Sequence, residues 1–237
     1  MAKKIEPFTS RFYGVLPARV NFLVDLYKIP KEKVELLVMG ADDEVVEIVK
    51  YEKTKFNIRE KHGIRKDDFL VVTGGKIDEA KIQTLLLIKS VKKLNDEKVK
   101  LIVFGSVVDS LKPKLEELCD GKNIQYIGWI DANESYRYFE EADIVVFPGR
   151  HSVFWEQVAG QGIPIICKYW EGTDHINIDG NVLFINEDSE REIYYNLRKV
   201  IYNEKIYSNM KKSANRNAHK FLYSNIAKKS IDEGKYE

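Results

Sequence analysis

Glycines and lysines with spacing suited to an anionic ligand lie between an apolar run and a segment with helical periodicity. The run Thr73-Gly74-Gly75-Lys76 is followed by Lys81, five positions after the first lysine. Backbone N–H groups at the start of a helix, together with the helix dipole, stabilise an anion, and the two lysines add positive charge nearby. This pattern favours a diphosphate, although lysines at the start of a Lys-rich helix are more often simply solvated. The loop matches neither GxxxxGK[ST] nor GxGxxG, which argues against an ATPase and a standard dehydrogenase.

A carboxylate follows a second glycine loop, within the segment from Phe147 to Gln157. Ser152 is the expected N-cap of a helix that carries Glu156 in or just past its first turn. A carboxylate at that place can accept hydrogen bonds from both vicinal hydroxyls of a ribose, or it can merely offset the dipole of its own helix. A Ser–His–Asp triad built on Ser152 and His151 is disfavoured, because neighbouring residues rarely face one another and no GxSxG pattern is present.

A third loop, Lys168–Ile176, combines aromatic, acidic and histidine residues. It is expected either to cover a sugar or a base, or to be packed as an ordinary loop, and both interpretations stay open. Metal ligation has little support, because Cys119 and Cys167 form no CxxC pair and no Asp-x-Asp pair suits Mn²⁺. We therefore expect no metal, no cofactor and reduced thiols.

A sheet whose strands end where the loops begin would position these residues. Short apolar runs without alternation predict strands buried on both faces: Phe69–Thr73, Leu101–Phe104, Ile124–Ile127, Ile144–Phe147 and Ile163–Cys167. Segments with helical spacing separate them: Ala80–Leu94, Leu111–Cys119, Ala132–Glu141 and Val153–Gln161. This alternation predicts a Rossmann-like α/β fold with a parallel sheet. Most of the strands run almost directly into glycine, which favours a ligand site at the carboxyl edge of the sheet.

Helical arms are predicted on both sides of this sheet. Residues 1–62 contain a predicted helix (Pro17–Tyr27), one strand (Val34–Met39) and charged helical material up to His62. Residues 189–237 are predicted to be almost entirely helical and to end with the helix Tyr223–Ile231. We therefore expect a mostly helical arm over residues 1–62, a Rossmann-like unit over residues 63–188, and C-terminal helices over residues 189–237.

The composition excludes several classes of protein. With 237 residues, of which 44% are hydrophobic and 32% charged, the chain can bury a core and is not intrinsically disordered. Its 38 basic and 37 acidic side chains nearly cancel, which removes the electrostatic basis for bulk nucleic-acid binding. No apolar run is long enough to span a bilayer and no signal peptide is evident, so a cytoplasmic protein is expected. The basic stretch from Lys211 to Lys229 allows at most peripheral contact with the inner face of a membrane.

A series of motifs follows in a distinctive order between Phe69 and Ile185. They are GGK with its second lysine, LIVFG, IQYIGWI, SYRYFEEADIVVFPG, WEQVAGQGIPIIC, EGTDHI and GNVLFI. This order resembles the nucleotide-sugar-binding half of a GT-B glycosyltransferase, and specifically glycosyltransferase family 4. The C-terminal FLYSNIAKKSI is similar to the closing helix of that family. The resemblance implies the C-terminal half of a GT-B fold, with residues 1–62 as the remnant of an N-terminal domain and the crossover.

The resemblance also implies roles for individual residues. Lys76 lies where the family usually has an arginine that holds the donor diphosphate, and Lys81 matches its lysine partner, so both are expected to stabilise the leaving group. Glu156 matches a glutamate that binds the ribose hydroxyls. The other implied donor-binding residues are Gly74 and Gly75 in the first loop, Trp129 and Ile130 at the nucleobase, and Ser152, Val153 and Phe154 near the phosphates.

The sequence also departs from the family pattern. The first glutamate of the paired motif, expected eight residues before Glu156, is replaced by Pro148. The loop between them is shorter and carries Arg-His-Ser at residues 150–152, so sugar recognition must differ from the common pattern. Lys76 in place of arginine keeps the charge but loses a bidentate fork. Only residues 1–62 precede the donor domain, so most acceptor contacts would come from a missing domain or a partner chain.

Together these features imply a retaining, metal-independent hexosyltransferase that takes its sugar from a nucleotide sugar, most simply a UDP-sugar. The process would be surface polysaccharide or glycoconjugate biosynthesis, with a glycan or lipid-linked acceptor. One alternative is a non-catalytic nucleotide-sugar-binding subunit, or a fragment, that needs a separate acceptor-binding domain. Another is a GT-B-like epimerase of nucleotide sugars. Apolar surface left by a missing neighbour could also support a homodimer.

Overall fold

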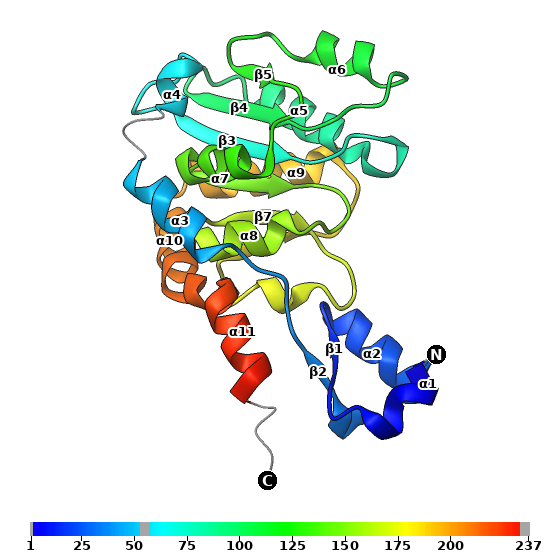
Figure 1. Ribbon diagram of the computed structural model, residues 1–237. Helices are drawn as coiled ribbons and strands as arrows, with labels where there is room; N and C mark the ends of the chain where they lie inside the picture. Colours follow the sequence, from blue (N-terminus) through cyan, green and yellow to red (C-terminus); the bar gives the residue numbers. More distant parts are fainter. Residues whose placement is uncertain (1, 53–56, 233–237) are drawn as a thin grey trace.

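The computed structural model describes residues 2–52 and 57–232. Its centre is a six-stranded parallel sheet in the order β5-β4-β3-β6-β7-β8 (Figure 1). The strands are β3 (Phe69–Gly74), β4 (Val99–Phe104), β5 (Ile124–Tyr126), β6 (Ile144–Phe147), β7 (Ile165–Lys168) and β8 (Val182–Ile185). The strand order reverses between β3 and β6, as in a Rossmann fold, so the predicted α/β fold with a parallel sheet is confirmed.

Helices cover both faces of the sheet. They are α5 (Gln83–Leu94), α6 (Lys112–Leu118), α7 (Ala132–Glu141), α8 (Phe154–Gln161) and α9 (Glu190–Ile201). Val71 and Val146 pack with α5, α6 and α9 on one face, whereas Val72 and Phe147 pack with α7 and α8 on the other. Because both faces are covered, the central strands consist of continuous apolar runs, which is why the sequence revealed them.

The strands at one edge of the sheet differ from the prediction. The pairing of β6 with β7 begins with Val145 and Ile165, two residues after the predicted start. Pro164 explains the shift, because proline has no N–H to donate to a ladder. β8 pairs with β7 as the sixth strand and was not predicted as a strand. Its residues Val-Leu-Phe-Ile form an apolar run as long as that of β6, although the central Leu183 and Phe184 are only partly buried.

The N-terminal arm contains a small sheet in addition to helical elements. Its elements are α1 (Ala2–Ile5), η1 (Glu6–Phe8), β1 (Phe12–Gly14), α2 (Pro17–Asp25), η2 (Lys31–Lys33) and β2 (Val34–Leu36). β1 and β2 form a parallel two-stranded sheet, of which only the second strand was predicted. Figure 1 shows this arm beyond one end of the main sheet. The N–H of Ala18 donates to the carbonyl of Gly172 at 3.3 Å, so the arm contacts the loop after β7.

The crossover and the C-terminal helices meet on the face covered by α8. These elements are α3 (Asp43–Tyr51), α4 (Ile58–Lys61), α10 (Glu204–Asn217), η5 (Ala218–Phe221) and α11 (Tyr223–Asp232). The N–H of Ala41 donates to the carbonyl of Phe221 at 2.7 Å, and Ala41 accepts from the N–H of Tyr223 at 2.9 Å. The predicted C-terminal helices are therefore present, and the last of them begins at Tyr223 as expected. None of the described helices is long and apolar enough to cross a membrane.

Candidate functional site

A cavity opens at the carboxyl ends of β3, β4 and β6, which is the edge where the sequence predicts a ligand. It is bordered by the glycine loops after β3 and β6 and by the short helix η3 (Glu79–Lys81) that leads into α5. The lining residues are Thr73, Gly74, Gly75, Lys76, Ile77, Lys81, Thr84, Val103, Phe104, Phe147, Pro148, Gly149, Arg150 and Ser152. Three of these are basic and none is a carboxylate, so the cavity has the charge that an anion requires.

The loop after β3 depends on glycine for packing and for open space. A Cβ on Gly74 would lie 2.2 Å from the ring of Phe104, and a Cβ on Gly105 would lie 2.0 Å from the carbonyl oxygen of Gly75. Gly75 has a φ of +126°, and no atom lies within 4 Å of where its Cβ would be. The close approaches at Gly74 and Gly105 therefore secure the loop, and the N–H of Gly75 donates to the carbonyl of Phe104 at 3.1 Å, so at Gly75 only the position of a side chain faces open space.

The basic residues of the cavity differ in how far the protein itself neutralises them. Lys76 Nζ lies 3.2 Å from Oδ2 of Asp78. Partial burial would raise the pKa of Asp78, but the hydrogen bond and the charge of Lys76 lower that pKa below its ordinary value. Within the described residues, Lys81 and Arg150 have neither an ion pair nor a side-chain hydrogen bond. The charge left uncompensated in the cavity is therefore that of Lys81 and Arg150.

The start of α8 corrects the capping prediction for Ser152. The N-cap is Val153, which already has helical angles (φ −57°, ψ −18°), and no side chain caps the helix. The carbonyl of Ser152 accepts the N–H of Trp155 at 3.0 Å and so closes the first turn. Ser152 is thus one residue too early to act as the cap, and it lines the cavity instead.

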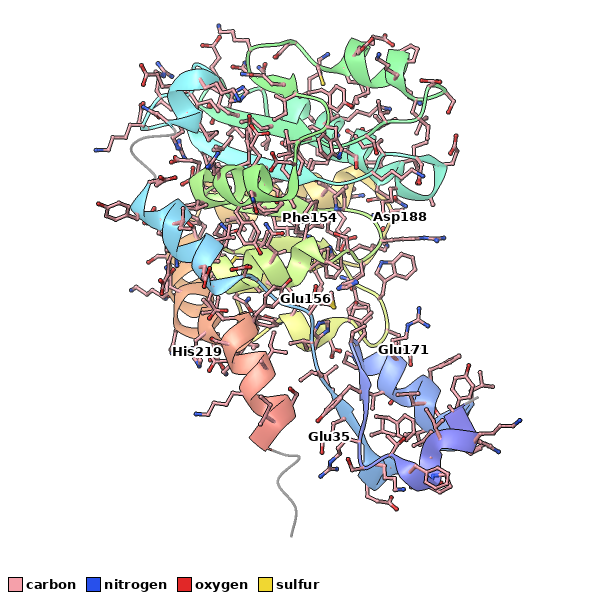
Figure 2. The ribbon with its side chains drawn as sticks, viewed as in Figure 1. Glu35, Phe154, Glu156, Glu171, Asp188 and His219 are labelled. Atoms are coloured by element: carbon pink, nitrogen blue, oxygen red, sulfur yellow. The ribbon has the colours of Figure 1, made fainter. Side chains whose placement is uncertain are left out.

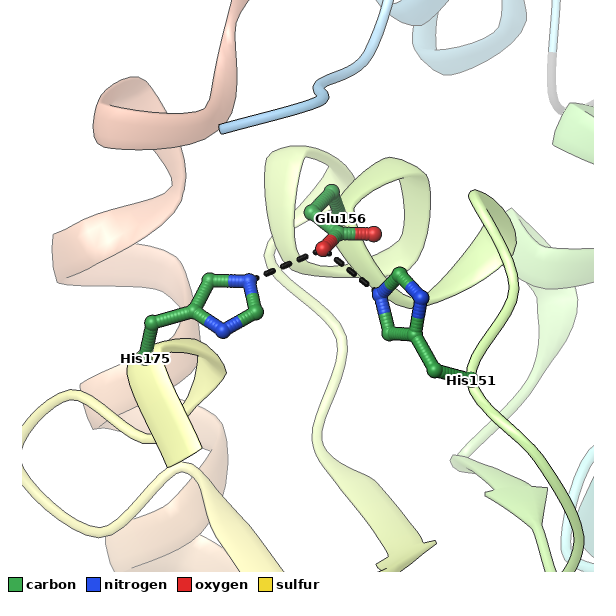
Figure 3. A group of neighbouring side chains, drawn as sticks. All are labelled: His151, Glu156 and His175. Atoms are coloured by element: carbon green, nitrogen blue, oxygen red, sulfur yellow. Dashed lines mark hydrogen bonds and ion pairs between the residues drawn. The ribbon is translucent and has the colours of Figure 1, made fainter. Parts of the chain in front are cut away.

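A buried cluster of His151, Glu156 and His175, which we call the His–Glu–His cluster, lies at the same edge of the sheet (Figure 3). Its members come from the loop after β6, from α8 and from η4 (Asp174–Ile176). Glu156 is 0% exposed, and its Oε1 accepts from Nε2 of His151 at 2.8 Å and from Nε2 of His175 at 2.9 Å. Burial would raise the pKa of Glu156, but the hydrogen bonds from His151 and His175 lower it below its ordinary value. The cluster therefore holds an ionised carboxylate away from water.

The side chains of this cluster are also, among the described residues, the ones close enough together to act as ligands of a metal ion. Their possible ligand atoms all lie within 4.8 Å of one another. In the hydrogen-bonded arrangement both imidazoles carry their proton on Nε2. A metal would need the Nε2 lone pairs, and would move the proton of His175 to Nδ1, which is buried without a partner. Since a buried unpaired donor costs about 1–3 kcal/mol, the geometry favours the hydrogen-bonded cluster.

The sequence model of the protein family described as glycosyl transferases group 1 matches residues 54–217, which is more than half of the chain. This chain belongs to the group 1 glycosyltransferases. The protein named uncharacterized glycosyltransferase MJ1607, from Methanocaldococcus jannaschii, is 22% identical to it over 219 residues. That alignment covers 87% of this chain and 55% of the relative, so the chain spans about half the length of that protein.

Solved structures resemble this group 1 glycosyltransferase along nearly all of its length. Anabaena Alr3699/HepE in complex with UDP has a TM-score of 0.75 at 15% identity, covering 98% of this chain and 65% of that chain. WaaG, a glycosyltransferase involved in lipopolysaccharide biosynthesis, has a TM-score of 0.68 at 18% identity, covering 94% of this chain and 62% of that chain. These likenesses show the fold, which is the α/β fold of the GT-B glycosyltransferases as predicted. The narrower assignment to family 4 stays a prediction.

The cavity of this glycosyltransferase brings together half of the residues predicted for its site, namely Gly74, Gly75, Lys76, Lys81 and Ser152. The other half lie outside its lining. Trp129 is 72% exposed, and Ile130 packs against the core beside it. The ring of Phe154 packs on Phe104 and Phe139 at 5.9 and 5.4 Å, Val153 is half exposed, and Glu156 is buried in the His–Glu–His cluster. The roles assigned to these residues stay predictions.

Two residues of the site received no role from sequence reasoning. Arg150 was visible only as a departure from the family pattern, although its place just after a strand and a glycine is where ligand-facing residues occur. His175 belongs to the polar loop after β7, which the sequence left undecided. Nothing local ties it to Glu156, nineteen positions away. Figure 2 shows that this loop, marked by Glu171, lies next to the N-terminal arm, where Gly172 accepts from Ala18.

Proposed function

We propose that this chain is the donor-binding domain of a retaining, metal-independent glycosyltransferase that transfers a hexosyl group from a UDP-sugar. The observation that carries the proposal is the cavity at the carboxyl edge of the sheet. There, three basic side chains and the glycine loop after β3 surround a space that no carboxylate of the described residues lines. Such a site suits the diphosphate of a nucleotide sugar better than it suits a neutral ligand.

The proposed chemistry places the leaving diphosphate in this cavity. When the bond between the sugar and the diphosphate breaks, negative charge grows on the phosphate oxygens. In the described part of the chain Lys81 makes no ion pair, so its ammonium is available to stabilise that charge, and Lys76 adds to it. Fixed positive groups that face developing charge are among the largest contributions to catalysis. In this proposal the protein supplies the electrostatic stabilisation that a metal ion supplies in other transferases.

The nucleoside would extend from the cavity toward the rest of the edge. Glu156 would accept the ribose hydroxyls through Oε2, which has no hydrogen-bond partner among the described residues, once the ligand reaches the buried cluster. Trp129, with most of its side chain exposed, would stack on the base. A UDP-linked donor is favoured because the solved structure of Anabaena HepE, which has this fold, contains UDP.

The acceptor would be a glycan or a lipid-linked saccharide, contacted mainly by a further domain or by a partner chain. WaaG, a protein of the same fold, is involved in lipopolysaccharide biosynthesis, which supports a role in surface polysaccharide or glycoconjugate assembly. A second candidate is a nucleotide-sugar-binding subunit without activity of its own. It is favoured by one observation, that the chain spans 55% of its Methanocaldococcus relative.

Calorimetric titration with UDP, GDP, ADP and CMP, each in EDTA, tests the donor site. UDP is expected to bind without metal and to raise the unfolding temperature. A ligand at a hundred times its Kd adds about 2.7 kcal/mol, which corresponds to roughly 5–10 °C for a domain of this size. If no nucleotide binds, with or without added divalent metal, the proposal is wrong. Transfer of sugar from a UDP-sugar to an acceptor, with the anomeric configuration of the product read by NMR, separates the retaining transferase from the binding subunit.

A further inference from the structure

Arg150 is the basic residue of the cavity to which no role has been assigned. Its exposed side chain lines the cavity together with Lys76 and Lys81. In the described part of the chain it makes no ion pair and no hydrogen bond, whereas Lys76 lies 3.2 Å from Asp78. None of the described residues that line this cavity is a carboxylate. A guanidinium in this setting has its five N–H donors available to an anion in the cavity.

The loop that carries Arg150 is fixed on both sides of it. A Cβ on Gly149 would lie 3.2 Å from Oε1 of Gln83 and 3.7 Å from Cα of Lys81, so the backbone of Gly149 packs on the segment that contains Lys81. On the other side, His151 donates to Glu156 at 2.8 Å, and its ring lies 4.9 Å from the ring of Trp155. The backbone of Arg150 is therefore held in place before any ligand binds, which lowers the entropic cost of using its side chain.

We propose that Arg150 binds the diphosphate of the sugar donor with its guanidinium, opposite Lys81; this rests on the proposed function. The loops that carry the two residues follow neighbouring parallel strands, β6 and β3, so both loops reach the same edge of the sheet. The planar guanidinium engages two phosphate oxygens at once, whereas an ammonium acts as a point charge. Lysine occupies position 76, so Arg150 is the residue that brings a bidentate group to this cavity.

Titration of three variants with UDP and UMP tests this assignment. Arg150→Ala removes the charge and the fork, Arg150→Lys removes only the fork, and Arg198→Ala removes the same charge from an exposed place on α9. Arg150→Ala is expected to weaken UDP binding about tenfold or more, because it removes charge-assisted hydrogen bonds. Its effect on UMP binding is expected to be clearly smaller. The affinity of Arg150→Lys for UDP is expected to lie between those of wild type and Arg150→Ala, and the affinity of Arg198→Ala is expected to match wild type. Unfolding temperatures are measured alongside to confirm that each variant is folded.

Each outcome bears on a different statement. If the wild-type chain binds no nucleotide, the proposed function fails and the role of Arg150 fails with it. If the wild type binds UDP and Arg150→Ala binds it as tightly as Arg198→Ala does, the donor site stands and the assignment of Arg150 is wrong. The assignment to both phosphates is also wrong if UDP and UMP are weakened by the same factor, since the arginine would then act only on what the two share, the nucleoside and its α-phosphate. If Arg150→Ala loses the preference for UDP over UMP and Arg150→Lys partly recovers it, the assignment of Arg150 is supported.

Discussion

The cavity and the His–Glu–His cluster lie at the same edge of the sheet, yet they handle charge in opposite ways. In the cavity, Lys81 and Arg150 keep their charges uncompensated by the described part of the protein. In the cluster, Glu156 is fully buried and its charge is met by two imidazole N–H groups. An uncompensated charge at the surface costs little stability and is available to a ligand, whereas a buried charge must be satisfied within the fold. Substitutions in the cavity should therefore change affinity with little loss of stability, whereas substitutions in the cluster should lower stability in addition to any effect on the proposed ribose contact of Glu156.

The largest expected effect comes from removing the centre of the cluster. Glu156→Ala leaves two imidazole N–H groups without their acceptor in a buried place. With about 1–3 kcal/mol for each buried donor left unpaired, a loss near 3 kcal/mol is expected, or roughly 6–12 °C in unfolding temperature. Differential scanning calorimetry measures it.

Glu171→Ala is the matched control for that substitution. Glu171 lies in the exposed part of the loop that carries His175, and its replacement is expected to change the unfolding temperature by less than about 2 °C, as surface substitutions do. If Glu156→Ala and Glu171→Ala lowered the unfolding temperature equally, the comparison would fail, because the buried carboxylate would then contribute no more stability than the exposed one.

The pH dependence of stability tests whether the ionised carboxylate of Glu156 stabilises the fold. The folded pKa of Glu156 is lowered by its hydrogen bonds to His151 and His175 in spite of burial, which would raise it. A lowered folded pKa contributes stability above the unfolded pKa, near 4.3, and that contribution is lost as the pH falls through the folded value. The difference in free energy of unfolding between wild type and Glu156→Gln, from urea titrations, should therefore shrink below about pH 4.3. A difference that stays constant or grows down to pH 3 contradicts this.

The strands that could be recognised most easily from the sequence are those buried on both faces of the sheet. Strands such as β4 and β6 are covered on both faces, so their apolar runs are unbroken and easily recognised. β1 has three residues, the last of them Gly14, and produces no comparable run. Edge position alone does not hide a strand, because the three-residue edge strand β5 was predicted, whereas β8, with the apolar run Val-Leu-Phe-Ile at the other edge, was missed. What burial on both faces requires can therefore be predicted from a single chain, whereas the pairing of edge strands depends on partners that the local sequence does not specify.

The candidate site was predictable to the same extent. The cavity combines consecutive residues after two strands, and five of its members were named from their spacing and from the family resemblance. The cluster depends on a contact between α8 and η4, so no local pattern indicated that His175 would donate to Glu156 at 2.9 Å. Ser152 was misjudged as a cap because the position of a helix start shifts by one residue with the backbone angles of Val153.

Within the cavity, Lys81 is expected to have the largest effect on affinity after Arg150. Lys81→Ala removes one of the two uncompensated charges, so UDP should bind about five- to tenfold more weakly, with a shallower dependence on salt. Calorimetric titration at two ionic strengths measures both. Lys122→Ala, at an exposed turn before β5, removes the same charge elsewhere and is expected to leave affinity unchanged. The unfolding temperature of Lys81→Ala is expected to stay near that of the wild type. If Lys81→Ala lost much stability and kept its affinity for UDP, the cavity would contribute to stability and not to affinity, and the comparison would fail.

The smallest expected effect has the opposite sign and concerns the pair formed by Lys76 and Asp78. Asp78 holds Lys76 at 3.2 Å and also caps η3, where its Oδ1 accepts the N–H of Ala80 at 3.0 Å. Asp78→Asn keeps an oxygen for the cap but removes the charge that neutralises Lys76. UDP should then bind about twofold more tightly, in line with the modest worth of an exposed ion pair. In a double-mutant cycle, the gain should disappear when Lys76 is alanine, because there is no longer an ammonium to release. If the gain persists in Lys76→Ala, Asp78 acts on the diphosphate directly and not through Lys76.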